Sequence, residues 1–319
     1  MSATLARLAA VVHAHPVAVF VVVFAVFPFV VPYRALATQV LIFGLFALGF
    51  NLLYGYTGLL SFGHAAYYGL GAYGTGIALA RLEWTSLWAG LGAGLALAVL
   101  GGALIGFFCL RRRGIYFSML TLAFAQLVYF IGFHSTDWTG GDDGLRGIPL
   151  LPTGLGIPLD TPLGFYYFAF GLVTLAVAAL KRILDSPFGA VLQAIRENTD
   201  RAVACGYDVT RVKLLSFVFS ALFSGLAGGL DALRLSVVPI ESLYWTTSGQ
   251  VVMMTLLGGA GTFFGPFVGA AAFLVLEDRL SVFIESWSLV VGAIFMAFVL
   301  FLPKGIWGTL LPRLGAARS

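Results

Sequence analysis

The sequence predicts an all-α polytopic membrane protein, and three observations carry this prediction. The 319 residues are 60% hydrophobic and only 10% charged, and the mean hydropathy is +0.98. This composition leaves too little charged surface for a soluble domain. Apolar runs that approach the ~20 residues of a membrane span recur along the whole chain. The 40 glycines favour a tightly packed bundle in which some helices are short or interrupted by glycine.

About ten transmembrane helices are predicted within a single transmembrane domain, residues 1–319. The first apolar run resembles the core of a signal peptide, and Ala35-Leu36-Ala37 resembles a cleavage site. We expect the run to be retained as a span, because Pro32 and Arg34 intervene and few basic residues precede it. The predicted spans are 17–32, 36–54, 63–80, 88–110, 114–133, 164–180, 214–233, 245–257, 265–277 and 286–302.

Positive charge predicts the orientation of these spans, because cytoplasmic connections are enriched in Lys and Arg. Arg111-Arg112-Arg113 follows the fourth span, so alternation places the N-terminus, residues 181–213 and the C-terminus inside. Of the 18 Lys and Arg residues, 13 then lie inside, Arg7, Arg313 and Arg318 among them. The loop 134–163 becomes external. Five tryptophans then lie near outer ends: Trp84, Trp88, Trp138, Trp245 and Trp287.

Small side chains recur at every fourth position in two of the predicted spans, a pattern that lets helix backbones approach closely. Both helices are therefore expected to be buried in protein. Two glycine-rich turns, GYTGLLSFGH and GGAGTFFGP, share a loose pattern that is weak evidence for duplicated halves. The stripes are Gly90, Gly94, Ala98, Gly102 and Gly106 in the fourth span, and Ser216, Ser220, Ser224, Gly228 and Ala232 in the seventh.

The segment 181–213 is the longest run with dense charge of both signs, and long apolar segments flank it. It predicts an amphipathic helix in which Ser186 is the N-cap and Pro187 the first helical residue. Such a helix buries its apolar face against its own bundle, the lipid surface or a soluble partner. That face comprises Phe188, Val191, Leu192, Ile195, Thr199 and Ala202.

The sequence contains no arrangement typical of an enzyme or of a metal site. It has no HExxH, CxxC, Gly-x-Ser-x-Gly or P-loop pattern, and Cys109 and Cys205 lie far apart. The adjacent carboxylates in TGGDDG are expected to form a solvated turn, because calcium needs six or more oxygens. The spans hold almost no ionisable groups, whereas ion-coupled carriers keep such groups at mid-membrane. Energy for any transport is therefore expected from a soluble partner.

Five motifs occur in one order: GYTGLLSFGHAAYYGLGAY, RRRGIYFSMLTLAFAQLVYF, TGGDDGLRGIP, SPFGAVLQAIRENTDRAVACGYDVTRVKLLSFVFSALFSGLAGGL and GGAGTFFGPFVGA. Together they resemble the branched-chain amino acid ABC importer permeases of the LivM type, over roughly residues 35–305. Asp200-Arg201-Ala202 followed by Gly206 resembles the E-A-A-x-x-x-G pattern of ABC permease coupling loops, with Asp in place of Glu and Arg in place of the first Ala.

The resemblance implies a non-catalytic permease subunit in the bacterial inner (cytoplasmic) membrane. Its partners would be a second homologous permease, two cytoplasmic ATPase subunits, a periplasmic substrate-binding protein and membrane lipid, but no nucleic acid. ATP and magnesium would bind to the partner subunits and no cofactor or metal to this chain. The solute would be a branched-chain amino acid or a related small polar or amphipathic molecule, such as urea, an amide or an aromatic acid. The alternative is a stand-alone channel or secondary carrier.

Three groups of residues are candidates for function. Coupling to the ATPase, in the loop 181–213, is assigned to Pro187, Phe188, Leu192, Ile195, Arg196, Glu197, Asp200, Ala202 and Gly206. Of these, Phe188, Ile195 and Ala202 are expected to be the docking anchors. Arg196, Glu197 and Asp200 are expected at the rim of the contact. The translocation path is assigned to Asn51, Tyr54, Ser61, His64, Ser118, Thr121, Gln126, Ser220 and Ser224, for which interhelical hydrogen bonding is the competing interpretation. Docking of the binding protein to the periplasmic loop 134–163 is assigned to Asp142, Asp143 and Glu241.

Overall fold

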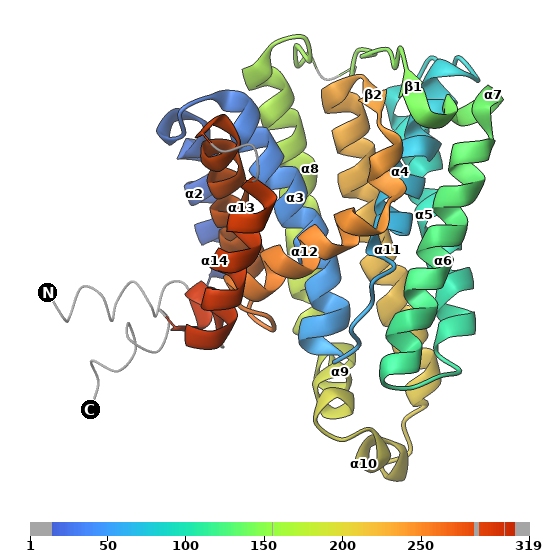
Figure 1. Cartoon of the computed structure of the whole chain (residues 1–319), viewed down its shortest axis with the longest axis vertical. Helices are drawn as coiled ribbons and strands as arrows, with labels where there is room; N and C mark the ends of the chain where they lie inside the picture. Colours follow the sequence, from blue (N-terminus) through green and yellow to red (C-terminus); the bar gives the residue numbers. More distant parts are fainter. Residues whose placement is uncertain (1–14, 155, 284–286, 303, 310–319) are drawn as a thin grey trace, which may run out of the picture.

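The computed structural model describes residues 15–154, 156–283, 287–302 and 304–309, and these form a bundle of helices (Figure 1). The longer helices are α2 (Pro16–Val30), α3 (Arg34–Asn51), α4 (His64–Ala80), α5 (Leu87–Cys109), α6 (Ile115–His134), α8 (Pro162–Leu184), α11 (Val209–Leu235), α12 (Trp245–Gly258), α13 (Gly265–Phe283) and α14 (Trp287–Phe301). The shorter elements are the π-helical turn η1 (Leu52–Tyr56), α7 (Thr136–Thr139), η2 (Gly141–Asp143), β1 (Leu145–Arg146), α9 (Pro187–Glu197), α10 (Thr199–Ala204), β2 (Val237–Val238) and η3 (Ile240–Leu243).

Each expected apolar run coincides with a helix, which confirms the all-α class. Within the described part of the chain, six helices are long and apolar enough to cross a membrane: α3 with η1, α5, α6, α8, α11 and the segment that contains α14. The count of ten spans and the placement of both termini remain predictions, and Arg7, Arg313 and Arg318 lie outside the described residues. Helix α13 extends beyond the expected end at residue 277 to Phe283.

Helices α4, α5 and α11 pack closely against one another, and the small-residue stripes lie at their contacts. The other side of α5 is uncovered in this chain, with Leu100 66% and Leu104 59% exposed, so the expectation that the whole of α5 is buried does not hold within the chain. Every residue of both stripes is buried. A β-carbon added to Gly94 would lie 2.3 Å from the carbonyl oxygen of Gly71, and one added to Gly228 would lie 1.9 Å from that of Tyr68. Side chains at these positions would push the helices apart, so the prediction that the stripes pack helices together is confirmed.

The two ends of the bundle carry different elements (Figure 1). At one end, β1 pairs antiparallel with β2, with Leu145 opposite Val238 and Arg146 opposite Val237. This pairing, together with α7 and η2, orders much of the loop 134–163 and ties it to the connection between α11 and α12. Helices α9 and α10 lie at the opposite end, so the two long polar connections are separated by the length of the bundle.

Candidate coupling and translocation sites

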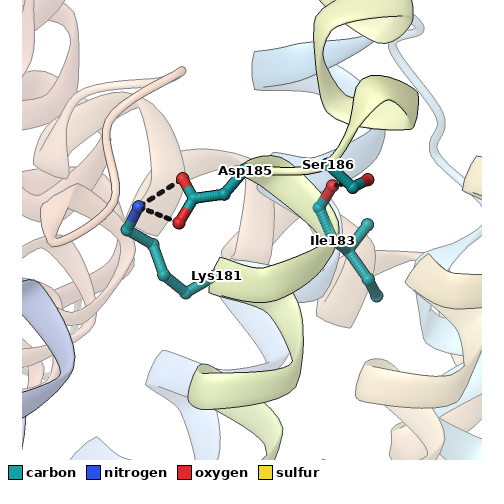
Figure 2. A network of polar contacts seen from close by, with 4 residues as sticks. All are labelled: Lys181, Ile183, Asp185 and Ser186. Carbon is teal, nitrogen blue, oxygen red and sulfur yellow. Dashed lines mark hydrogen bonds and ion pairs between the residues drawn. The ribbon is translucent and has the colours of Figure 1, made fainter.

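Helix α9 follows α8 after a sharp turn, whose polar contacts are drawn in Figure 2, and lies at the end of the bundle (Figure 1). Pro187 is in the first turn of α9 and Ser186 occupies the N-cap position, as predicted. The Ser186 hydroxyl, however, makes no capping bond to α9; it donates to the carbonyl oxygen of Ile183 at 2.6 Å. Lys181 pairs with Asp185 on the last turn of α8. The hydroxyl therefore bonds to the C-terminal end of α8 and does not cap the N-terminus of α9.

The amphipathic segment is two helices, not one continuous helix. Asn198 has an extended backbone, with φ −158° and ψ 104°, and separates α9 from α10. Its side-chain oxygen accepts a hydrogen bond from the backbone N–H of Arg201 at 2.9 Å, so Asn198 is the N-cap of α10. Gly206, with φ +86°, provides the left-handed turn after α10. The prediction of one helix with a continuous apolar face from residue 188 to residue 202 is therefore wrong: the first helix ends at Glu197.

The apolar side chains of α9 and α10 pack on this chain's own bundle. Leu192 is 0%, Ile195 2% and Ala202 3% exposed, and the last two form a cluster with Val209 of α11. Phe188 is half-buried, with its ring 5.9 Å from that of Phe219. Ile195 and Ala202 are thus covered by their own chain, and their assignment as ATPase docking anchors stays a prediction. The predicted coupling residues that remain exposed are Pro187, Arg196, Glu197, Asp200 and Gly206.

Arg196 differs from the other exposed residues because its side chain reaches into two glycine-rich turns. Its Nη1 donates a hydrogen bond to the carbonyl oxygen of Gly55 in η1. A β-carbon on Gly58 would lie 3.1 Å from Arg196 Cγ, and one on Gly261 would lie 2.9 Å from Nη1. Arg196 was expected at the rim of a partner contact. The structure instead places its guanidinium against its own chain, where glycine leaves room for it.

Asn51 joins the same two turns from inside the bundle. Its Oδ1 accepts from the N–H of Gly261 at 2.8 Å, and its Nδ2 donates to the carbonyl oxygen of Thr262 at 2.9 Å. Gly55 is required here, because a β-carbon would lie 2.1 Å from Asn51 Oδ1 and 2.5 Å from Gly261 N. Arg196, Gly55, Asn51 and Gly261, which we call the coupling node, connect α9 to the end of α3 and to the α12–α13 turn.

Two of the predicted path residues form a buried hydrogen-bonded pair. His64 Nε2 lies 2.8 Å from Ser220 Oγ, which donates to the carbonyl oxygen of Gly49 at 2.7 Å. A serine hydroxyl has one proton, so the His64 Nε2–H is the donor in this pair. The ring of His64 packs against those of Phe50 and Tyr67. The pair joins α3, α4 and α11.

Other predicted path residues support the non-helical segment before α4. Thr121 accepts from the N–H of Phe62 at 3.1 Å, and Ser118 donates to the carbonyl oxygen of Leu60 at 2.6 Å. From α12, a hydroxyl that the sequence reasoning missed, Ser248, accepts from the N–H of Ala65 at 2.8 Å. Irregular backbone at membrane depth needs such partners, because lipid offers none. Hydroxyls from α6 and α12 thus hold the start of α4.

The path assignment itself stays a prediction. Five of its nine members hydrogen-bond to another segment of the chain, as the competing interpretation expects: Asn51, His64, Ser118, Thr121 and Ser220. Tyr54, Ser118 and Gln126 are half-buried, whereas Asn51, Ser61, His64, Thr121, Ser220 and Ser224 are fully buried.

The residues predicted to dock a binding protein lie at one end of the molecule. Asp142, Asp143 and Glu241 are exposed, and the β1–β2 pair brings their two segments together. Asp143 pairs with Arg146 at 3.2 Å. The docking role also stays a prediction.

Comparison with known proteins identifies the family. The model of the branched-chain amino acid transport system / permease component family matches residues 33–300. The chain belongs to this family. The high-affinity branched-chain amino acid transport system permease protein LivM of Salmonella typhimurium is 30% identical over 302 residues, which are 88% of this chain and 71% of the relative. LivM of Escherichia coli is 30% identical over 311 residues, 89% of this chain and 73% of the relative.

More distant relatives have other solutes in their names. The guanosine ABC transporter permease protein NupQ of Bacillus subtilis is 28% identical over 215 residues, 64% of each chain. No solved structure matches the chain. The resemblance drawn from the five motifs is thus confirmed at the level of the family.

Proposed function

We propose that this chain is a permease subunit of an ATP-driven importer for branched-chain amino acids or a related small solute. Membership of the permease family carries this proposal. The chain itself is non-catalytic. It spans the inner membrane beside a second, homologous permease, two ATPase subunits contact it from the cytoplasm, and a substrate-binding protein delivers the solute from the periplasm.

The end of the bundle with α9 and α10 is the cytoplasmic end in this proposal. The exposed surface of both helices, including Pro187, Glu197 and Asp200, contacts the ATPase. Their apolar surface packs against α11 and the rest of the bundle, so a displacement of α9 moves the bundle with it. The coupling node supplies a second, polar connection, from Arg196 to the ends of α3 and α12. Nucleotide-driven motion thereby reaches helices that lie next to the predicted path.

The proposed path is uncharged, which suits a zwitterionic or neutral solute. Asp231 and Arg234, two charged residues of α11, pair with each other at 2.8 Å, and Tyr68 donates to the same carboxylate at 2.7 Å. The polarity along the predicted path comes from Asn51, Gln126, the imidazole of His64 and hydroxyl side chains. Such a path holds its solute weakly, so affinity and selectivity belong to the binding protein.

Reconstitution tests the proposal. The chain, its partner permease and the ATPase subunits are placed in proteoliposomes, and uptake of radiolabelled leucine, isoleucine, valine and guanosine is followed with binding protein and ATP. Uptake should require ATP hydrolysis and the binding protein. Solute flux through the chain in liposomes without ATPase subunits, at the rate of the full complex, would favour the channel or carrier alternative and would contradict the proposal.

A further inference from the structure

A basic cavity of about 440 Å³ lies where α5 ends and where α6 and α11 begin. It is defined here by Arg112, Arg113, Gly114, Tyr207, Thr210 and Lys213, which are part of its lining. These residues come from the arginine triplet and from the segment after α10. The sequence analysis used the arginines to orient the spans and placed Tyr207, Thr210 and Lys213 in the coupling loop 181–213. The coupling node does not include this cavity.

Positive charge in this cavity is poorly compensated. Of the described residues that line it, Asp208 is the one acid, and it pairs with Arg211 at 2.8 Å. Arg113 has its closest acid, Asp200, at 3.9 Å, with both side chains more than four-fifths exposed, a pairing of little energetic weight. Two arginines and one lysine therefore line a space that threonine and tyrosine residues also line. This chemistry suits a phosphate ester.

An apolar hollow continues from the basic cavity along α6. Arg112 lines both spaces, and the hollow, about 760 Å³, is otherwise lined by Tyr116, Met119, Leu120 and Ala123. Tyr116 is 76% and Met119 65% exposed, so this face of α6 is apolar and uncovered in the chain. A ligand that filled both spaces would carry an anionic head and hydrocarbon tails.

The surroundings correspond to a membrane interface. The guanidinium of Arg111 lies over the Phe107 ring, 4.6 Å from its centroid, as expected for a cation whose stem follows apolar surface while its head reaches water. Of the hydrophobic window of α6, only 22% is buried inside the chain. In the orientation proposed above, on which this inference rests, the basic cavity is at the cytoplasmic end of a helix face that hydrocarbon can cover, where lipid headgroups lie.

We propose that the basic cavity binds the phosphodiester headgroup of an anionic phospholipid, with its acyl chains along the apolar hollow of α6. Basic pockets at the cytoplasmic ends of membrane helices bind such headgroups through the same chemistry. Thr199 and Val203 of α10 also line the cavity. A bound headgroup therefore contacts the segment that we propose to couple the permease to its ATPase.

Native mass spectrometry of the full-length chain tests this site. The chain in detergent is titrated with phosphatidylglycerol, with phosphatidylcholine and with inorganic phosphate. Phosphatidylglycerol should bind, and Arg112→Gln combined with Lys213→Gln should weaken it about 30-fold, the effect of two interfacial cations. The matched control is Arg182→Gln combined with Arg201→Gln, which removes two exposed cations outside the cavity and should leave binding within about twofold.

A second readout locates the acyl chains and guards against misfolding. A photoreactive group on an acyl chain of phosphatidylglycerol should label residues 115–123 in the wild type, and the charge-preserving pair Arg112→Lys and Arg113→Lys should retain this labelling. The proposal is overturned if phosphatidylcholine or inorganic phosphate binds as tightly as phosphatidylglycerol, or if both variant pairs weaken binding equally. It is also overturned if labelling spares residues 115–123 in the wild type, or if the assembled importer excludes the lipid because a subunit covers the cavity.

Discussion

Arg196→Ala should uncouple ATP hydrolysis from solute uptake while the chain stays folded and assembled. The substitution removes the hydrogen bond from Nη1 to Gly55 and the aliphatic stem that lies against Gly58. Leu192 and Ile195 keep their buried contacts, so α9 remains attached to the bundle. What is lost is the polar connection from α9 to the two glycine-rich turns.

The size of the expected loss of coupling follows from the strength of the hydrogen bond between Arg196 and Gly55. A hydrogen bond that involves a charged group contributes about 1.5–3 kcal/mol. Arg196 is exposed, so solvent screening favours the lower end, about 1.5 kcal/mol, which corresponds to about a tenfold change in an equilibrium. We therefore expect the number of solute molecules imported per ATP hydrolysed to fall about tenfold.

The assay compares uptake and ATP hydrolysis in the same proteoliposomes. Glu197→Ala is the matched control for helix stability, because Glu197 is the next residue, is exposed and makes no hydrogen bond to the two turns in the described structure. It should alter assembly with the ATPase but not the ratio of uptake to hydrolysis in complexes that do form. Arg196→Lys should give an intermediate ratio, since an ammonium group cannot reproduce the guanidinium geometry. If Arg196→Ala keeps the wild-type ratio, the reasoning about the node is refuted.

Three further substitutions test other parts of the account. Gly55→Ala should lower the yield of folded protein and its melting temperature, at a cost of about 1–3 kcal/mol, because a β-carbon would lie 2.1 Å from Asn51 Oδ1; a wild-type melting temperature would contradict the tight contact. Ile195→Asp should destabilise the chain by about 2–7 kcal/mol, the cost of burying a polar group without a partner, since Ile195 is 2% exposed. Normal thermal stability together with lost coupling would instead support the prediction that Ile195 docks on the ATPase. Asp142→Lys combined with Asp143→Lys should weaken uptake and reduce its dependence on salt, and an unchanged salt profile would exclude this loop as the docking site.

The sequence predicted the helices well, because their signal is local. Apolar length located the long helices, and the four-residue stripes identified the sides on which α5 and α11 pack. The stripes did not show that the other side of α5 is uncovered in this chain, with Leu100 66% and Leu104 59% exposed. The break at Asn198 was missed because the apolar periodicity continues through Thr199 and Ala202. Asn198 followed by Thr199-Asp200 is itself an N-cap signal that could have revealed it.

The coupling node could not be predicted, since it depends on contacts between distant segments. Arg196 neighbours Ile195 on the helix, and periodicity assigns it to the polar surface, but only the fold brings Gly55 and Gly261 beside it. The same is true of Ser248 from α12, whose hydroxyl accepts from Ala65. Sequence showed which side of α9 is apolar; it did not show that its own bundle covers that side.

A double-mutant cycle on the coupling node tests the central claim most directly. Uptake of radiolabelled leucine per ATP hydrolysed is measured in the reconstituted importer for the wild type, Arg196→Ala, Asn51→Ala and the double variant. If α9 acts through the node, the double variant should lose no more than the worse single variant, because either substitution already breaks the connection from α9 to the α12–α13 turn. Losses that multiply, or a wild-type ratio in both single variants, would contradict the claim that motion of α9 reaches the membrane helices through these residues.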